Sequence, residues 1–238
     1  MKKQLNLIYP IPRGQFILWI VIRCVLIGYG IYCLLTGYTT GFLMGCFSVA
    51  FSHLWDLFQL LGGKSFITRV DYFSQTLLNC FLIVGCIIGP YLNDHTNFAY
   101  MDIIEHTFAG FLAAWFAYDL ATAIQGKKHH IKPALAALFA VWFAVGITVA
   151  WEFYEFTMDR VYGYTLQRSS LLSESGLTDT MGDMICGAVG GVLGMFIVAF
   201  WKNGIIGKNR KELRRLAKAQ SKADREEELA YLEEVGKY

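Results

Sequence analysis

The amino-acid sequence predicts an all-α membrane protein, a polytopic bundle of six transmembrane helices with a charged cytoplasmic helix at the C-terminal end. Two observations carry this prediction. Of the 238 residues, 55% are hydrophobic and 16% are aromatic, more than an ordinary soluble domain contains. Many charged residues follow Trp201, which leaves the preceding body still more apolar. We therefore divide the chain into a transmembrane domain, residues 1–201, and a basic, charged tail, residues 202–238.

Six apolar segments of the first domain are long enough to cross a bilayer, since a transmembrane helix needs about 20 mainly apolar residues. The first of them follows a basic N-terminal stretch, as the core of a signal peptide does. It is long, lacks a cleavage site and contains Arg23, so we interpret it as a span. The expected spans cover about 15–36, 40–62, 72–93, 102–125, 133–157 and 178–201.

The Lys and Arg residues of the short loops predict the orientation. They precede the first span, lie between spans 2 and 3 and between spans 4 and 5, and follow span 6, so they all fall on one side. The opposite loops hold only Arg160 and Arg168. Because short cytoplasmic loops are enriched in Lys and Arg, we expect a multi-pass protein of the cell membrane with both termini in the cytoplasm.

The tail mixes Glu with Lys and Arg at helical spacing, which predicts a solvated cytoplasmic helix. Basic residues directly after a span attract anionic headgroups by about 1 kcal/mol each, so membrane lipids are the expected partners. A nucleic-acid partner is not expected, because base-reading chemistry is lacking.

Span 6 contains the stretch GAVGGVLG, whose small residues allow another helix to approach closely. This pattern permits homo-oligomerisation, but packing within the chain is favoured because partner helices are available there. The glycines concerned are Gly187, Gly190, Gly191 and Gly194.

One group of ionisable residues falls in the cytoplasmic half of the spans, where each charge costs at least about 2.5–3.5 kcal/mol on insertion scales. This inner polar cluster consists of Arg23, His53, Asp56 and Asp119. His53 and Asp56 are three positions apart, so a continuous helix carries them on one face. A structural Arg–Asp pair explains most of the group, and a proton relay or a substrate role is the alternative.

A second group falls at the outer ends of spans 4, 5 and 6, where each helix carries one acidic stripe. The predicted topology brings the three stripes to the same level in the membrane. The main members are Asp102, His106, Glu152, Glu155, Asp179 and Asp183, and Glu105 and Asp159 are further candidates.

Carboxylates gathered in this number at the edge of an apolar bundle repel one another. We therefore expect that some of them are protonated or that a cation lies among them. Oxygen ligands with one histidine suit Mg, Mn, Ca or Fe better than a thiolate zinc site, although zinc is not distinguished from these. Helix capping is the alternative for Asp102 and Asp179. It does not explain Glu152 and Glu155, which lie near a helix C-terminus, where the dipole disfavours negative charge.

Three motifs in this region resemble those of a known family. They are DxxxHxxxGF from Asp102 to Phe111, ExxE from Glu152 to Glu155, and DTxxDM from Asp179 to Met184. In order and spacing they resemble the YjdF-type membrane-spanning family, uncharacterised bacterial inner-membrane proteins, with a weaker similarity to VanZ-like proteins. The resemblance implies a multi-pass membrane protein and supplies no reaction. The chain departs from both families because Glu105 directly precedes His106.

We expect an outward-facing cation site that acts on an envelope or lipid-linked substrate by hydrolysis or group transfer. A proton- or cation-coupled transporter is the first alternative, and a structural or regulatory membrane protein without catalysis is the second. The sequence contains no recognisable nucleophile, nucleotide-binding loop or cofactor motif, so the catalytic residues and the reaction stay open.

Overall fold

The protein is described from a computed structural model, which covers residues 11–60, 72–89, 91–92, 100–125, 133–167, 174–207 and 210–235. Within these ranges the chain forms α-helices and one π-helical segment. The elements are α1 (Arg13–Thr36), α2 (Thr39–Ser52), α3 (Leu54–Leu60), α4 (Tyr72–Ile83), η2 (Val84–Ile88), α6 (Met101–Gln125), α7 (Pro133–Tyr162), α8 (Glu174–Lys202) and α9 (Arg210–Val235).

Three helices are long and apolar enough to cross a bilayer, namely α1, α7 and the Gly176–Lys202 part of α8, each with a mean hydropathy of 2.1. The apolar segments Thr39–Ser52 and Tyr72–Ile88 are shorter, and α6 carries three carboxylates along its 25 residues. A location in the membrane follows from the three apolar helices. The number of six spans stays a prediction.

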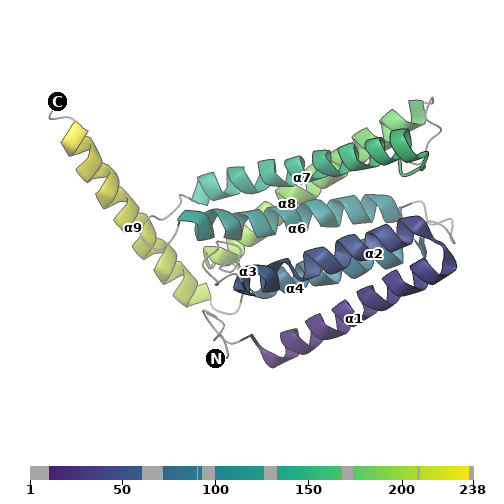
Figure 1. Ribbon diagram of the computed structural model, residues 1–238. Coiled ribbons are helices and arrows are strands. Elements are labelled where there is room, and N and C mark those ends of the chain that lie inside the picture. Colours follow the sequence, from purple (N-terminus) through teal and green to yellow (C-terminus); the bar gives the residue numbers. More distant parts are fainter. Residues whose placement is uncertain are drawn as a thin grey trace.

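The helices from α1 to α8 lie side by side, so that their ends gather at two opposite ends of the bundle (Figure 1). One end holds the turn between α1 and α2, the start of α6 and the end of α7, and we call it the distal end. The other holds the start of α1, the end of α8 and α9, and we call it the tail end. The start of α6, the end of α7 and the start of α8 therefore lie at the same end.

Glycines bring α8 into close contact with α6. A Cβ atom on Gly190 would overlap the backbone carbonyl of Thr107, and one on Gly110 would overlap that of Gly187. Small residues at this spacing let helix backbones approach one another. The glycines of α8 thus lie against helices of the same chain, while the oligomeric state stays a prediction.

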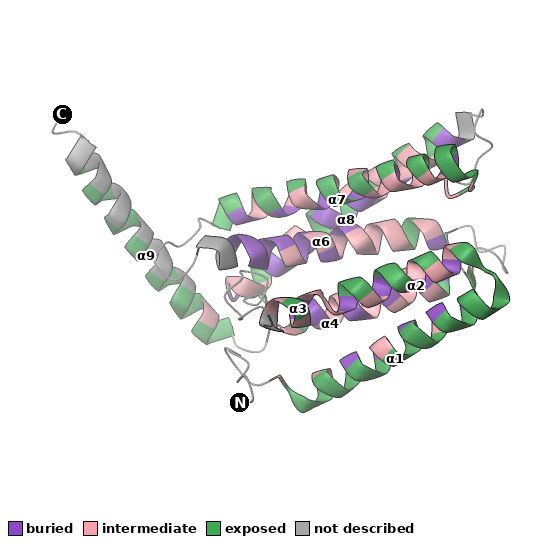
Figure 2. Ribbon diagram, viewed as in Figure 1, coloured by how far each residue is buried: buried purple, intermediate pink, exposed green. Residues whose placement is uncertain are grey.

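The packed helices enclose two apolar cores. The larger lies among α6, α7 and α8 and includes Ala114, Ala140 and Val198, and the smaller joins Ile22 and Leu26 of α1 to Leu82 and Cys86. The faces turned away from these cores are exposed and apolar, most clearly along α1 (Figure 2). Such faces suit contact with lipid.

The predicted second span is not one continuous helix. It is interrupted at His53, where φ is −101° and ψ is 1°, and the ring Nδ1 lies 2.8 Å from the carbonyl oxygen of Val49. In the predicted third span, α4 passes into the π-helical turn η2. Just beyond that turn, the carboxylate of Glu105 occupies the space that a side chain at Gly89 would need.

Candidate cation site

Five of the predicted site residues converge at the distal end. Asp102 and His106 lie in the first two turns of α6, Glu152 and Glu155 lie near the end of α7, and Asp183 lies in α8. The glycine packing of α8 against α6 holds the first and third of these helices close together. The helical spacings i,i+4 and i,i+3 then place each pair on the face that meets its neighbours.

The first group joins α6 to α8. The Nε2 atom of His106 lies 3.7 Å from Oδ1 of Asp102 and 3.6 Å from Oδ2 of Asp183. One atom from each of the three residues falls within 4.8 Å of the others. The imidazole therefore faces two carboxylates at a separation that a cation can bridge.

The second group joins α7 to α8 and consists of Glu152, Glu155 and Asp183, whose oxygens also lie within 4.8 Å of one another. Glu152 is 3% exposed and Asp183 is 5% exposed. Asp183 belongs to both groups, so it is the central residue of the site.

Glu152 carries the most informative feature of the site. Both of its carboxylate oxygens are buried, and neither makes a hydrogen bond among the residues that the structure describes. The hydroxyl of Thr180, which accepts a hydrogen bond from Nε2 of Gln167 at 2.7 Å, lies near Glu152 without meeting hydrogen-bond geometry. A buried carboxylate that lacks a partner is costly, so this group requires a positive ligand or a proton.

Glu155 has a defined orientation. Its Oε1 accepts a hydrogen bond of 2.9 Å from the indole Nε1 of Trp151, one turn earlier in α7. The second oxygen stays available for a ligand, because one carboxylate oxygen is enough for the bond to the indole.

The spacing of the two groups fits a hard divalent cation. Oxygen ligands of Mg and Ca lie about 2.0–2.6 Å from the ion, so ligands on opposite sides of it are about 4–5 Å apart. The distances of 3.7 Å and 3.6 Å from Nε2 of His106 to Asp102 and Asp183 are slightly below this separation. Small side-chain movements suffice to bring them to coordination distance.

Two other predicted ligands have different positions. Asp159 is 1% exposed, and its two oxygens accept the backbone N–H groups of Leu166 at 2.7 Å and Gln167 at 3.0 Å. It therefore anchors the chain that follows α7. Glu105 lies beside Gly89 and is absent from the two cation groups that the described residues form.

Asp179 is partly exposed and is likewise absent from these two groups, as far as the described residues go. The capping role considered for it is wrong, because α8 begins at Glu174 and places Asp179 in the second turn. Asp102 follows the first residue of α6 and is not its N-cap either, but its place in the first turn agrees with the expected complement to the helix dipole.

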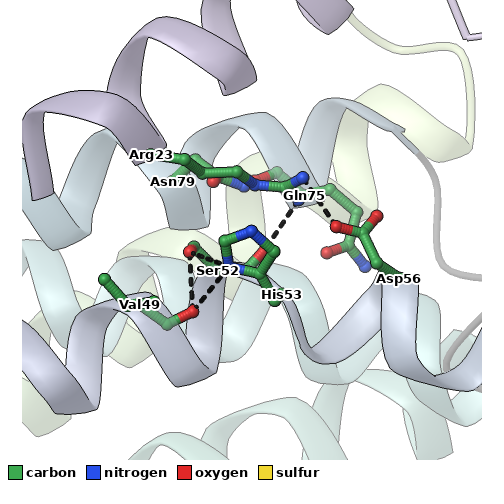
Figure 3. Close-up of polar contacts among 7 residues, drawn as sticks. All are labelled: Arg23, Val49, Ser52, His53, Asp56, Gln75 and Asn79. Atoms are coloured by element: carbon green, nitrogen blue, oxygen red, sulfur yellow. Dashed lines mark hydrogen bonds and ion pairs between the residues drawn. The ribbon is translucent and has the colours of Figure 1, made fainter. Parts of the chain in front are cut away.

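The inner polar cluster separates into two ion pairs. Arg23 pairs with Asp56 at 2.6 Å and donates to the carbonyl oxygen of Ser52, also at 2.6 Å (Figure 3). The guanidinium thus stabilises the interruption between α2 and α3, where His53 lies. The predicted structural Arg–Asp pair is present.

Asp119 is held by other residues. Its Oδ1 lies 2.7 Å from Nζ of Lys202, and its Oδ2 accepts a hydrogen bond of 2.9 Å from the hydroxyl of Ser74. The sequence reasoning missed both partners, although Asp119 and Lys202 lie near the ends of α6 and α8 that meet at the tail end. It also missed Gln75 and Asn79, which are buried in α4 beside Arg23 (Figure 3).

Comparison with known proteins gives one match. Residues 60–204 match the model of a family described as predicted membrane proteins (DUF2238). No curated protein and no solved structure matches the chain.

Proposed function

Since the chain belongs to the DUF2238 family of predicted membrane proteins, we propose that it binds a divalent cation at the distal end of its bundle and acts there on an envelope or lipid-linked substrate. The buried carboxylate of Glu152, which no described residue satisfies, carries this proposal. A cation next to it satisfies Glu152, Glu155 and Asp183 together. The three motifs of the YjdF-type resemblance contain the same residues.

In this role the converging carboxylates would hold the ion, with Asp183 shared by the two groups, and would leave coordination positions to water or substrate. A bound cation polarises a phosphoryl or carbonyl oxygen and acidifies a bound water. The imidazole of His106 would accept the proton of that water, because its Nε2 faces two of these carboxylates. The positive-inside pattern supports a distal end that faces away from the cytoplasm in the cell membrane.

A carrier is the second candidate, and the inner charges argue against it. A proton path to the tail end needs titratable groups that are available, whereas Asp56 is paired with Arg23 and Asp119 with Lys202. Unchanged ion and proton flux in proteoliposomes after Glu152→Gln substitution is the expected result. A purely structural role predicts that this substitution lowers stability and leaves function intact.

Metal analysis of the purified full-length protein tests the proposal. We expect at least one Mn²⁺ per chain by electron paramagnetic resonance, and a rise in the melting temperature on adding Mg²⁺, Mn²⁺ or Ca²⁺. Glu152→Gln and Asp183→Asn each remove a ligand charge and should weaken Mn²⁺ binding by at least about tenfold.

Glu226→Gln is the matched control, because Glu226 is exposed on α9 and far along the chain from the site. It should bind Mn²⁺ like the original protein. The proposal would be contradicted if the protein, purified without chelators, held no bound metal and its melting temperature did not change on adding Mg²⁺, Mn²⁺ or Ca²⁺.

A further inference from the structure

A large apolar groove lies on the surface between α2 and α7. Its volume is about 910 Å³, near the upper end of the range of about 300–1,000 Å³ that is usual for small-molecule sites. Its walls are aliphatic and aromatic. The lining includes Leu43, Phe47, Phe51, Ile147, Trp151 and Tyr154.

The groove exists because the two helices that form its walls, α2 and α7, pack against different neighbouring helices. The close backbone contacts of α2 are with α1, α3, α4 and η2, while those of α7 are with α6 and α8. Across the gap, the rings of Phe47 and Trp151 meet edge to face with their centroids 6.1 Å apart. Phe51 and Ile147 remain 43% and 47% exposed, so the groove is open along the surface that suits lipid.

One side chain joins the groove to the cation site. Trp151 lines the groove with its ring and donates its Nε1 hydrogen to Glu155, whose carboxylate belongs to the second cation group. An apolar chain against Trp151 is thus separated from the acidic groups by a single indole. The groove and the cation site are therefore adjacent.

The distal mouth of the groove matches the headgroup level of a bilayer. Its lining there includes Thr39, the first residue of α2, and Tyr162, the last residue of α7, followed by Tyr164. Tyrosine is enriched at the membrane–water interface because its ring is apolar and its hydroxyl is polar. A molecule in the groove can therefore lie with one end in the hydrocarbon region and the other at the interface.

We propose that the groove holds a hydrocarbon chain of a phospholipid whose phosphate group binds the cation. This inference rests on the proposed function, because the carboxylates alone repel a phosphate and the bound cation attracts it. It names the substrate class as a lipid phosphate. The indole of Trp151 lies between the groove and Glu155.

Photolabelling of the full-length protein tests the inference. The probe is phosphatidylglycerol with a diazirine on one acyl chain, in phosphatidylcholine vesicles with Mn²⁺ or with a chelator. We expect labelled peptides within 39–51 and 147–158, and stronger labelling with Mn²⁺. Ala150→Phe fills the groove and should reduce this labelling several-fold. Ala134→Phe, at an exposed position in the first turn of α7, is the matched control and should not.

The metal content of the same samples separates the two proposals. Mn²⁺ bound at the site, with labels spread evenly over the exposed face of α1, overturns the groove and leaves the cation site standing. Groove labelling that is equal with Mn²⁺ and with chelator, although Mn²⁺ is bound, overturns the phosphate assignment alone. Protein that binds no Mn²⁺ overturns the proposed function itself.

Discussion

Asp183 is the residue on which the candidate site depends most. It contributes to both cation groups, and it is the only one of the five converging residues that comes from α8. Glu152 ranks next, because its burial leaves both oxygens without a hydrogen bond among the described residues. Loss of either side chain should therefore affect binding more than loss of Glu155, whose Oε1 is also held by Trp151.

The role of Asp159 gives a prediction that distinguishes a loop anchor from a ligand. In Asp159→Asn the side chain keeps one acceptor oxygen and loses the other, together with its charge. Since hydrogen bonds to charged groups contribute about 1.5–3 kcal/mol, the free energy of unfolding in detergent should fall by about that amount. Mn²⁺ affinity should stay within a few-fold of the original value. A loss of affinity as large as that of Asp183→Asn would instead make Asp159 a ligand.

For individual residues, the sequence predicts that the acidic stripes of neighbouring helices lie together. It does not predict the other contacts that each side chain makes. Spacing alone places Glu152 and Glu155 on one face, and topology brings them to Asp183. Spacing cannot reveal that the carboxylate of Asp159 is used by backbone N–H groups further along the chain. Nor can it reveal the bond between Asp119 and Lys202, which depends on how far α6 and α8 each extend.

The element that positions the site is α8, through its glycine face. Where a Cβ atom on Gly190 would overlap Thr107, no side chain can be accommodated without separating α6 from α8. This separation moves Asp183 away from Asp102 and His106. Stability and cation binding should therefore fall together when the glycine face is altered.

Gly190→Ala and Gly146→Ala form a matched pair that tests this link. The first should lower the free energy of unfolding by about 1–3 kcal/mol, as overpacking does, and weaken Mn²⁺ binding. Gly146 has open space around its Cβ position, so Gly146→Ala should be neutral or stabilise the helix by up to about 1 kcal/mol. Equal effects in the two variants, measured by chemical unfolding and Mn²⁺ titration, would contradict the packing argument.

Helix positions were predictable, and helix irregularities were not. The expected segments overlap the helices α1, α6, α7 and α8, with ends that differ by up to five residues, because long apolar segments favour helices. The interruption at His53 and the turn η2 leave no trace in hydropathy, because hydropathy does not report the local backbone hydrogen bonding. The contacts of Arg23 and Ser52 at the first of these sites are equally invisible to it.

For the whole molecule, the proposal requires the distal end to face away from the cytoplasm. The basic loops predict this orientation, and the arrangement of helices places α9 at the opposite end from the cation site (Figure 1). The orientation can be predicted from the sequence alone, because the distribution of Lys and Arg among short loops does not depend on any tertiary contact.

Cysteine labelling in intact cells measures the orientation. In a variant whose six native cysteines are replaced, the substitution Tyr164→Cys should introduce a thiol that reacts with a membrane-impermeant maleimide added outside the cells. A cysteine at Leu229, which is exposed on α9, should react only after permeabilisation. The reverse pattern would place the cation site in the cytoplasm and remove envelope substrates from consideration.

The π-helical turn Val84–Ile88 has a consequence for how the chain tolerates insertion and deletion. A π turn holds one residue more than the α-helix around it, and such turns are frequent at functional sites. Deleting one residue there removes the extra residue and restores α-helical winding without turning the residues that follow, so Gly89 keeps facing Glu105. Winding the same residues as a regular α-helix would instead rotate Gly89 by about 100° away from Glu105. Deletion of one residue from this turn should therefore be tolerated better than insertion of one, which leaves a further residue that the turn does not accommodate.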